Sequence, residues 1–170
     1  NVSEIIRVLE HADKEIQLHI SQNQIAFVFD KTYLISRLID GSFPDYKQII
    51  PKESVTEVIV LKQDLLNILK KTTVFSDTFN QVKFSIKPAK KLFSIQSHNA
   101  DIGETFDAVT ATVKGEPLDI NFNHRYISDC FQSFSASDSI ILLFDGLSKP
   151  MIIKGVSDNS FLYLVMPMNK

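Results

Sequence analysis

The stretch LDINFNHRYISDCFQSF, residues 118–134, decides the fold class of this chain. Its first five residues alternate between apolar and polar side chains, which predicts a half-buried strand. Asn123 is a favourable helix N-cap, so a helix is expected to begin directly behind the strand. That helix places large side chains on one stripe: Tyr126, Ile127, Cys130, Phe131 and Phe134. Three further strands are expected, at residues 139–144, 150–155 and 161–168.

The same order of elements recurs towards the N-terminus. A strand at residues 55–61 leads into a helix at 63–75, whose apolar face is expected to carry Leu65, Leu66, Leu69 and Thr73. Strands at 82–86, 92–96 and 106–113 follow, and a first helix near residues 2–9 precedes strands at 16–20, 25–29 and 32–39. A repeat of roughly 60 residues predicts a duplicated α+β architecture.

The three units cannot all pair within this chain. The second and third are expected to form one domain of two helices and eight strands over residues 52–170. The first unit has no partner, so its sheet should keep an open edge and a half-covered core. The chain is therefore expected to be the C-terminal part of a longer protein.

Composition indicates an ordinary globular protein. The chain has 170 residues, of which 44% are hydrophobic and 22% charged. It contains no apolar run of about 18 residues and its start does not resemble a signal peptide, so a cytoplasmic location is expected. The net charge of -2 neither indicates nor excludes a nucleic-acid partner, because the positions of the basic residues decide binding.

No arrangement of residues typical of catalysis is present in the sequence. The four histidines are dispersed, and the five glycines form no phosphate-binding loop. The single cysteine, Cys130, excludes an internal disulfide and falls on an apolar helix stripe, where a buried structural thiol is expected. No enzymatic activity, cofactor or metal is therefore expected.

Three motifs resemble those of one family. They are LIDGSFPDYKQIIP at residues 38–51, FNHRY at 122–126 and LYLVMPM at 162–168. In this order and at these spacings the chain resembles the bacterial DNA polymerase III beta subunits, the sliding clamps. The resemblance implies a DNA-clamp fold, with residues 1–43 as the second half of the middle domain, 44–51 as the interdomain connector and 52–170 as the C-terminal domain.

The resemblance also implies a peptide-binding groove that receives short motifs from DNA polymerase and clamp-loader subunits. The matching positions are Pro44, Gln48, Ile49, Asn123, Tyr126, Leu147, Val165, Met166, Pro167 and Met168. Gln48 stands where many clamps carry a basic residue, and the loop of the middle domain that completes the groove is absent from this chain. Plain interdomain packing is the alternative role for Phe43 and Tyr46.

Two further surfaces follow from the resemblance. Duplex DNA would be contacted without sequence preference by Arg7, Lys70, Lys71 and Arg125. A second subunit would be contacted by Val74, Phe75, Asp101 and Glu104. The alternatives are ordinary solvent exposure for the basic residues and core packing for Phe75.

The expected function is that of a DNA polymerase processivity factor, which encircles duplex DNA as a homodimeric ring. The ring is not expected to form from this chain alone, because the domain that completes it is missing. The alternative is a stand-alone peptide-binding adaptor that has the groove but no ring.

Overall fold

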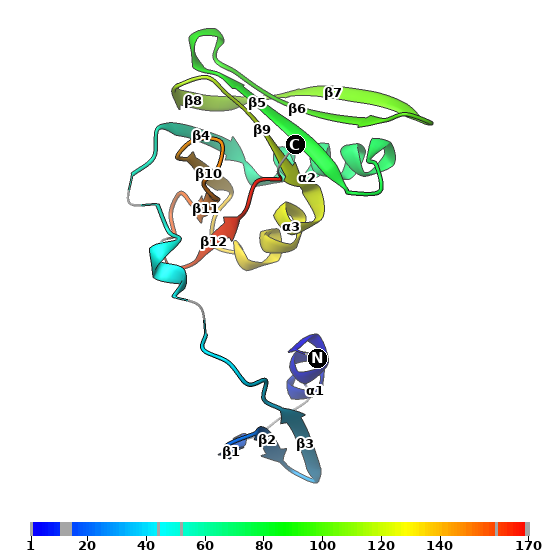
Figure 1. Cartoon of the computed structure of the whole chain (residues 1–170), viewed down its shortest axis with the longest axis vertical. Helices are drawn as coiled ribbons and strands as arrows, with labels where there is room; N and C mark the ends of the chain where they lie inside the picture. The colour runs from blue at the N-terminus through cyan, green and yellow to red at the C-terminus, as the bar shows by residue number, and fades with distance from the viewer. Residues whose placement is uncertain (1, 11–14, 44, 52, 159, 169–170) are drawn as a thin grey trace. The chain divides into compact units, whose positions relative to one another are not determined.

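The computed structural model describes residues 2–10, 15–43, 45–51, 53–158 and 160–168. The chain divides into two compact units, residues 1–44 and residues 45–170 (Figure 1). Each unit has its own sheet or sheets, so each is described by itself.

The N-terminal unit is a helix and a three-stranded antiparallel meander. It contains α1 (Val2–Leu9), β1 (Gln17–Ile20), β2 (Gln24–Phe29) and β3 (Thr32–Arg37), and the strands pair in the order β1-β2-β3. Among its described hydrophobic side chains only Ala26 and Phe29 are buried, whereas Leu18, Ile20 and Ile35 are exposed. The expectation of a half-covered core in this unit agrees with this exposure.

The C-terminal unit is built from two copies of one pattern. The first copy is β4 (Thr56–Leu61), α2 (Lys62–Thr72), β5 (Gln81–Lys87), β6 (Leu92–Asn99) and β7 (Gly103–Val109). The second copy is β9 (Leu118–Asn123), α3 (His124–Asp129), β10 (Ser139–Phe144), β11 (Met151–Gly155) and β12 (Leu162–Val165). Short 3-10 turns are η1 (Tyr46–Gln48), η2 (Thr73–Phe75), η3 (Pro88–Lys90) and η4 (Cys130–Ser133). The predicted duplication and the α+β fold class are confirmed.

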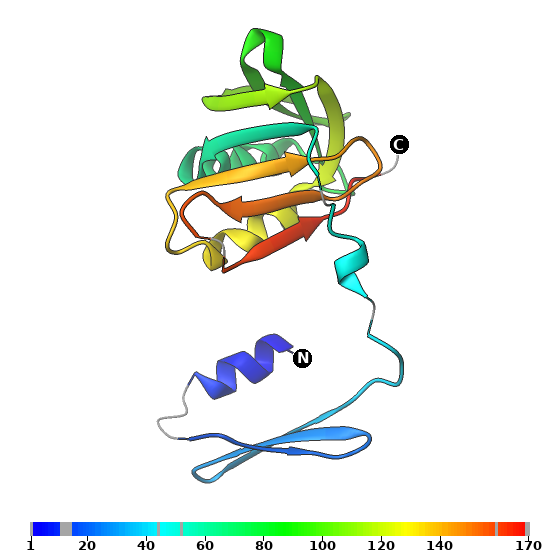
Figure 2. The ribbon, with the colours of Figure 1, turned by 90° about the vertical axis from the view of Figure 1, so that its left-hand side faces the viewer.

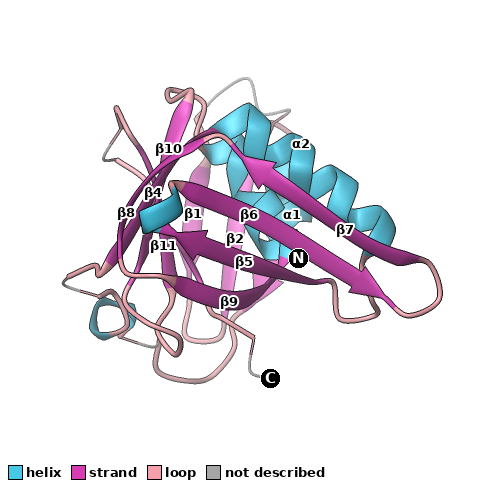
Figure 3. Ribbon diagram, turned by 90° about the horizontal axis from the view of Figure 1, so that it is seen from above, coloured by secondary structure: helices cyan, strands magenta, loops and turns pink. Residues whose placement is uncertain are grey.

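The two copies complete each other's sheets. The meander β10-β11-β12 is extended by β4 from the first copy, and the meander β5-β6-β7 is extended by β9 from the second. Figure 3 shows β7, β6, β5 and β9 side by side in this order, with α2 running along them. All pairings in both sheets are antiparallel. Neither copy has a complete sheet without the other.

One segment belongs to both sheets. The sequence predicts a single strand over residues 106–113, but the structure divides this region into β7 and β8 (Ala111–Gly115), on either side of Thr110. β7 pairs with β6, whereas β8 pairs with β4 at the far edge of the other sheet. The prediction of eight strands was therefore wrong by one in the described part of the C-terminal unit, because the chain turns a corner between sheets within one alternating run.

The core between the sheets is rich in phenylalanine. Phe84 packs edge-on against Phe93 and Phe122, with ring centroids 5.3 and 5.4 Å apart, and Phe122 lies 6.4 Å from Phe144 of the other sheet. These four rings are buried and connect the two sheets. Aromatic pairs in this geometry stabilise a core beyond the area that they bury.

The helix faces differ in detail from the expected ones. On α2 the buried residues are Leu65, Ile68, Leu69 and Thr72, and the predicted Leu66 is half-buried against the same core. The observed face therefore adds Ile68 and Thr72 to the predicted stripe and leaves out only the exposed Thr73. Thr72 is tolerated in the core because its hydroxyl donates to the Leu69 carbonyl at 2.8 Å. On the second helical stretch Ile127, Cys130, Phe131 and Phe134 are buried as expected, but Tyr126 faces outwards.

Two glycines give a matched test of backbone packing. Gly115 (φ +96) lies against the Val55 carbonyl, where an added Cβ would clash, whereas Gly146 (φ +95) has no atom within 4 Å of that position. Both substitutions to alanine carry the left-handed strain of about 1–2 kcal/mol. We expect Gly115→Ala to lower the free energy of unfolding by a further ~1–2 kcal/mol or more, as overpacking does, measured by urea denaturation. Equal losses in the two variants would contradict this packing.

Candidate functional site

The register of the five-stranded sheet brings several chain segments to one end. Phe144 of β10 pairs with Thr56 of β4, and Met151 of β11 pairs with Val165 of β12. The Val55 amide also donates to the Phe144 carbonyl at 2.8 Å. The turn at 145–150, the tail at 166–168 and the segment that enters β4 therefore leave the sheet at the same end (Figure 2).

The C-terminal tail crosses from this sheet to the other one. Val165, at the end of β12, is only 2% exposed and belongs to the core, so its side chain anchors the tail rather than facing a ligand. The next side chain, Met166, is exposed. The Met168 amide donates to the Asn121 carbonyl at 2.8 Å, which fixes the tail beside β9 just before α3 begins.

The start of α3 holds a neighbouring loop. The Asn123 carboxamide oxygen accepts from the Arg125 amide at 3.0 Å and caps the helix, as the sequence predicts. The same side chain donates through Nδ2 to the Phe79 carbonyl at 3.2 Å. Asn123 thus joins the helix to the loop at residues 76–80.

This loop contributes an apolar side chain that sequence reasoning missed. Phe79 is 67% exposed, as are Leu147 at 62%, Tyr126 at 59% and Met166 at 57%. We name the set formed by Phe79, Tyr126, Leu147, Met166, Pro167 and Met168 the apolar end surface. Phe79 stands alone in the polar stretch SDTFN, so no periodicity singles it out. The sequence marks Phe79 only by placing a large aromatic side chain in a short polar loop.

The connector residues form a short turn in the C-terminal unit. Asp45 accepts from the Lys47 amide at 3.2 Å and from the Gln48 side chain at 3.0 Å, and Ile49 is exposed at the end of η1. The Gln48 amide group is therefore directed at Asp45. Pro44, the remaining predicted groove residue of this segment, lies outside the described residues.

His124 is a buried ionisable residue behind the apolar end surface. It is 3% exposed, its amide donates to the Asn80 carbonyl at 3.0 Å, and its Nε2 lies 3.3 Å from the Ser76 hydroxyl. Burial lowers the pKa of His124, and the positive charge of Arg125 lowers it further, while Asp77 acts in the opposite direction. The imidazole is therefore neutral at physiological pH.

The predicted DNA-facing residues are exposed, but they are not equivalent. Lys70 and Lys71 end α2 and Arg125 begins α3, and these two helices contact each other. Lys71 forms an ion pair with Asp107 at 3.2 Å. Arg7 lies on α1 in the N-terminal unit, beside a cavity of about 330 Å³.

The predicted subunit-contact residues gather near β7, which is an edge strand. The turn η2 contacts β6 and β7, and the Phe75 carbonyl accepts from the Ser97 hydroxyl at 3.0 Å. Val74 is exposed, whereas Phe75 is half-buried and leaves only part of its ring accessible. Glu104 lies on β7 opposite His98 at 4.0 Å, and Asp101 is in the turn before this strand.

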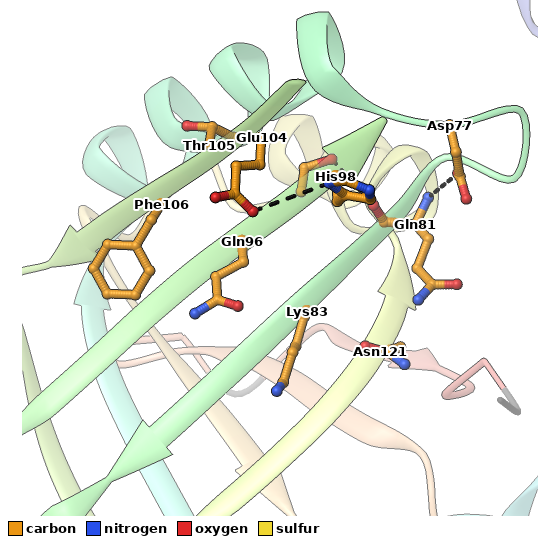
Figure 4. Close-up of a pocket in the computed structure, with 10 residues that line it drawn as sticks. Asp77, Gln81, Lys83, Gln96, His98, Glu104, Thr105, Phe106 and Asn121 are labelled. Atoms are coloured by element: carbon orange, nitrogen blue, oxygen red, sulfur yellow. Dashed lines mark hydrogen bonds and ion pairs between the residues drawn. The ribbon is translucent and has the colours of Figure 1, made fainter. Parts of the chain in front are cut away.

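A cavity of about 480 Å³ lies elsewhere, on the outer face of the four-stranded sheet. Figure 4 shows its lining: Gln96, His98 and Lys83 stand on neighbouring strands, with Phe106 and Glu104 on β7 and Asp77 at the end of the trough. Its walls are mainly polar, and Tyr126, Leu147 and Met166 take no part in it. Within the described ranges, no group of three or more potential ligand residues could hold a metal ion.

The only cysteine is unsuited to nucleophilic chemistry. Cys130 is buried, and its thiol donates to the Ile127 carbonyl at 3.0 Å. Burial raises the pKa of Cys130 to about 12, so the thiolate is scarce at neutral pH.

In the described part of the chain, no helix is long and apolar enough to cross a membrane.

Comparison with known proteins gives one consistent result. Residues 47–169 match the C-terminal domain of the DNA polymerase III beta subunit, and residues 1–45 match its central domain. The beta sliding clamp of Bacillus subtilis is 28% identical over 171 residues, which cover 99% of this chain and 45% of that protein. The beta sliding clamp of Synechococcus elongatus is 33% identical and covers 92% of this chain and 42% of its own length.

Solved structures agree with these matches. A sliding clamp from Bartonella birtlesii bound to griselimycin superposes with a TM-score of 0.87 at 30% identity, over 99% of this chain and 45% of that one. The Bacillus subtilis clamp gives a TM-score of 0.85 at 28% identity, with the same coverage of 99% and 45%. The chain thus spans less than half the length of the relatives that it matches.

The environment of Cys130 leads to a labelling prediction. Because thiolate is the reactive form and the pKa is raised to about 12, we expect the native chain to react with a disulfide reagent at pH 8 at least about a hundredfold more slowly than the chain unfolded in guanidinium. Absorbance of the released thiol measures both rates. Comparable rates would show that Cys130 is accessible and ionised in the native chain.

Proposed function

This chain belongs to the DNA polymerase III beta subunit family, whose members are non-enzymatic processivity factors, and from this membership we propose that it is part of a sliding clamp. In this proposal the whole protein encircles duplex DNA in the bacterial cytoplasm. It docks polymerase and clamp-loader subunits by capturing short peptides on the C-terminal unit.

The apolar end surface is the single observation that carries the docking proposal. Four large apolar side chains are exposed on segments that leave one end of the five-stranded sheet or adjoin the start of α3: Phe79, Tyr126, Leu147 and Met166. Exposed apolar clusters commonly mark sites of protein contact. Methionine side chains adapt to several ligands, and Pro167 needs no hydrogen-bond partner for its nitrogen. We propose that the surface receives a short peptide that ends in Leu or Phe.

The proposed peptide site extends to the connector. Gln48, the last residue of η1, and Ile49, its C-cap, belong to the same unit. Both precede β4, whose first residues lie at the same end of the sheet. Asn123 supports the site indirectly, because its side chain caps α3 and also holds the 76–80 loop through the Phe79 carbonyl. Val165 fixes the tail from the core.

We propose that exposed lysine and arginine side chains on the protein's helices contact DNA. Scattered Lys and Arg side chains attract phosphates without reading sequence, and this attraction weakens with salt. Lys70 and Arg125 are the stronger candidates, because Lys71 is already paired with Asp107. Arg7 would act in the same way from α1.

A contact with a second subunit is proposed at the β7 edge. Val74, Phe75, Asp101 and Glu104 lie on or beside an edge strand, and they combine an apolar corner with acidic side chains. A head-to-tail interface closes into a ring only if the complementary surface exists on the partner. The complementary surface would lie in the part of the clamp that this chain does not span.

One alternative is a peptide-binding adaptor that has the groove but no ring. The chain spans about 45% of the clamps that it matches, and its N-terminal unit exposes apolar side chains. Retention on circular DNA separates the two functions.

The docking proposal predicts peptide binding with a defined sensitivity. We expect an uncharged peptide containing Gln, Leu and Phe to bind the chain, and Met166→Ala to weaken it about fivefold to thirtyfold, since truncating a contacting side chain costs ~1–2 kcal/mol. Isothermal titration calorimetry gives both affinities.

Val156→Ala is the matched control for this experiment. Val156 is also exposed, but it follows β11 at the opposite end of the same sheet, so its truncation should leave the affinity unchanged. Equal effects of the two substitutions, or no effect of either, would place the peptide elsewhere.

The ring proposal predicts different behaviour for the chain and the whole protein. After incubation with clamp loader and ATP, we expect the 170-residue chain to leave nicked circular DNA at once during gel filtration in high salt, because scattered phosphate contacts are screened. A full-length parent should stay until the circle is linearised. Retention of the 170-residue chain would contradict the need for the missing part.

A further inference from the structure

His124 is a buried ionisable residue to which the proposed docking function assigns no role. The ring lies under the loop at residues 76–80, where Nε2 is 3.3 Å from the Ser76 hydroxyl. Its amide donates to the Asn80 carbonyl at 3.0 Å, so ring and backbone hold opposite ends of the loop. With 3% of its surface exposed, His124 cannot itself touch a docked peptide to any useful extent.

The loop is compact and is held from two sides, by α3 and by β6, where Asn99 Nδ2 donates to the Ser76 carbonyl at 2.8 Å. Asp77 accepts from the amides of Phe79 at 3.0 Å and Gln81 at 3.1 Å, and Asn80 adopts a left-handed conformation with φ +57. These bonds make the loop a compact turn. Two residues of the β9–α3 junction, Asn123 and His124, tie this turn to the first turn of the helix.

We propose that His124 is a positioning residue of the apolar end surface: its neutral imidazole holds the 76–80 loop, and hence Phe79, against the start of α3, and protonation of this imidazole loosens the loop and weakens peptide binding. The affinity part of this inference rests on the proposed docking function. The loop-holding part rests on geometry alone.

The physical basis is the cost of charging a buried ring. The Ser76 hydroxyl donates to the Thr73 carbonyl at 3.0 Å, so it accepts from Nε2–H of His124. The neutral ring with its proton on Nε2 and the protonated ring both make this donation, so the hydrogen bond survives protonation. The cost comes from burial and from Arg125 on the same helix, and Asp77 in the loop offsets it only in part, so the pKa of His124 lies below its ordinary value of 6.5.

The direction of the pH effect follows from this lowered pKa. An opened loop exposes the imidazole to water and restores its ordinary pKa, so the opened form binds protons more readily than the closed one. The stability of the closed loop is therefore fully present above pH 6.5 and is lost as the pH falls from there towards the lowered pKa. Acid shifts the population to the open loop.

The test measures peptide affinity at about pH 7.5 and pH 5.5, on either side of the ordinary histidine pKa. The probe is an acetylated and amidated peptide of Gln, Leu and Phe without titratable groups. For the unaltered chain we expect severalfold weaker binding at the lower pH. His124→Asn should bind severalfold more weakly than the unaltered chain at pH 7.5 and should show no further loss in acid.

His98→Asn is the matched control. His98 is an exposed histidine on β6 that faces Glu104, and among the described residues no hydrogen bond joins its side chain to the 76–80 loop. This variant should keep the full pH dependence of the unaltered chain. A pH dependence that persists in His124→Asn, or disappears in His98→Asn, overturns the assignment to His124.

Amide hydrogen exchange of the peptide-free chain decides the loop-holding part separately. After correction for the intrinsic pH dependence of exchange, the amides of residues 76–80 should lose protection between pH 7.5 and 5.5 in the unaltered chain and in His98→Asn. In His124→Asn they should be weakly protected at both values. Unchanged protection in His124→Asn would overturn the positioning role. Failure of the peptide to bind the unaltered chain would instead overturn the docking function and the affinity part.

Discussion

The C-terminal unit depends on the exchange of first strands between its two halves. β4 of the first half extends the meander of the second, and β9 of the second extends the meander of the first. The phenylalanine rings between the sheets then fill one shared core. The N-terminal unit shows the cost of lacking such a partner, because its meander leaves Leu18, Ile20 and Ile35 exposed. A single half of this architecture leaves apolar side chains of its sheet uncovered.

The same pairing creates the candidate docking surface. Because β10, β11, β12 and β4 are antiparallel, a turn, a tail and an incoming segment all leave one end of the sheet. The tail then reaches β9, where Asn123 and His124 hold the loop that carries Phe79. In the proposed docking site, side chains distant in sequence are supplied by segments that the strand register and the start of α3 hold in place.

Local patterns predict the elements better than their connections. Alternation and the Asn123 cap give the strand, the helix start and the duplication, since these depend on neighbours in sequence. The break at Thr110 arises because β8 pairs with β4 of the five-stranded sheet. The burial of Ile68 and Thr72 arises from the packing of α2 in the folded unit. Local sequence patterns therefore did not predict either feature. The roles of the docking residues came from motif resemblance alone. Phe79 and the burial of His124 escaped notice because both arise from contacts between the 76–80 loop and α3.

The central claim is that partner peptides occupy the apolar end surface and not the polar cavity on the outer sheet face. Photo-crosslinking of a Gln/Leu/Phe peptide that carries a benzophenone side chain, followed by mass spectrometry, distinguishes the two most directly. The account predicts crosslinks to Tyr126, Leu147 or the tail at Met166–Met168, competed away by unlabelled peptide. Crosslinks concentrated at Gln96, His98 or Phe106 would contradict it, because these residues line the other cavity.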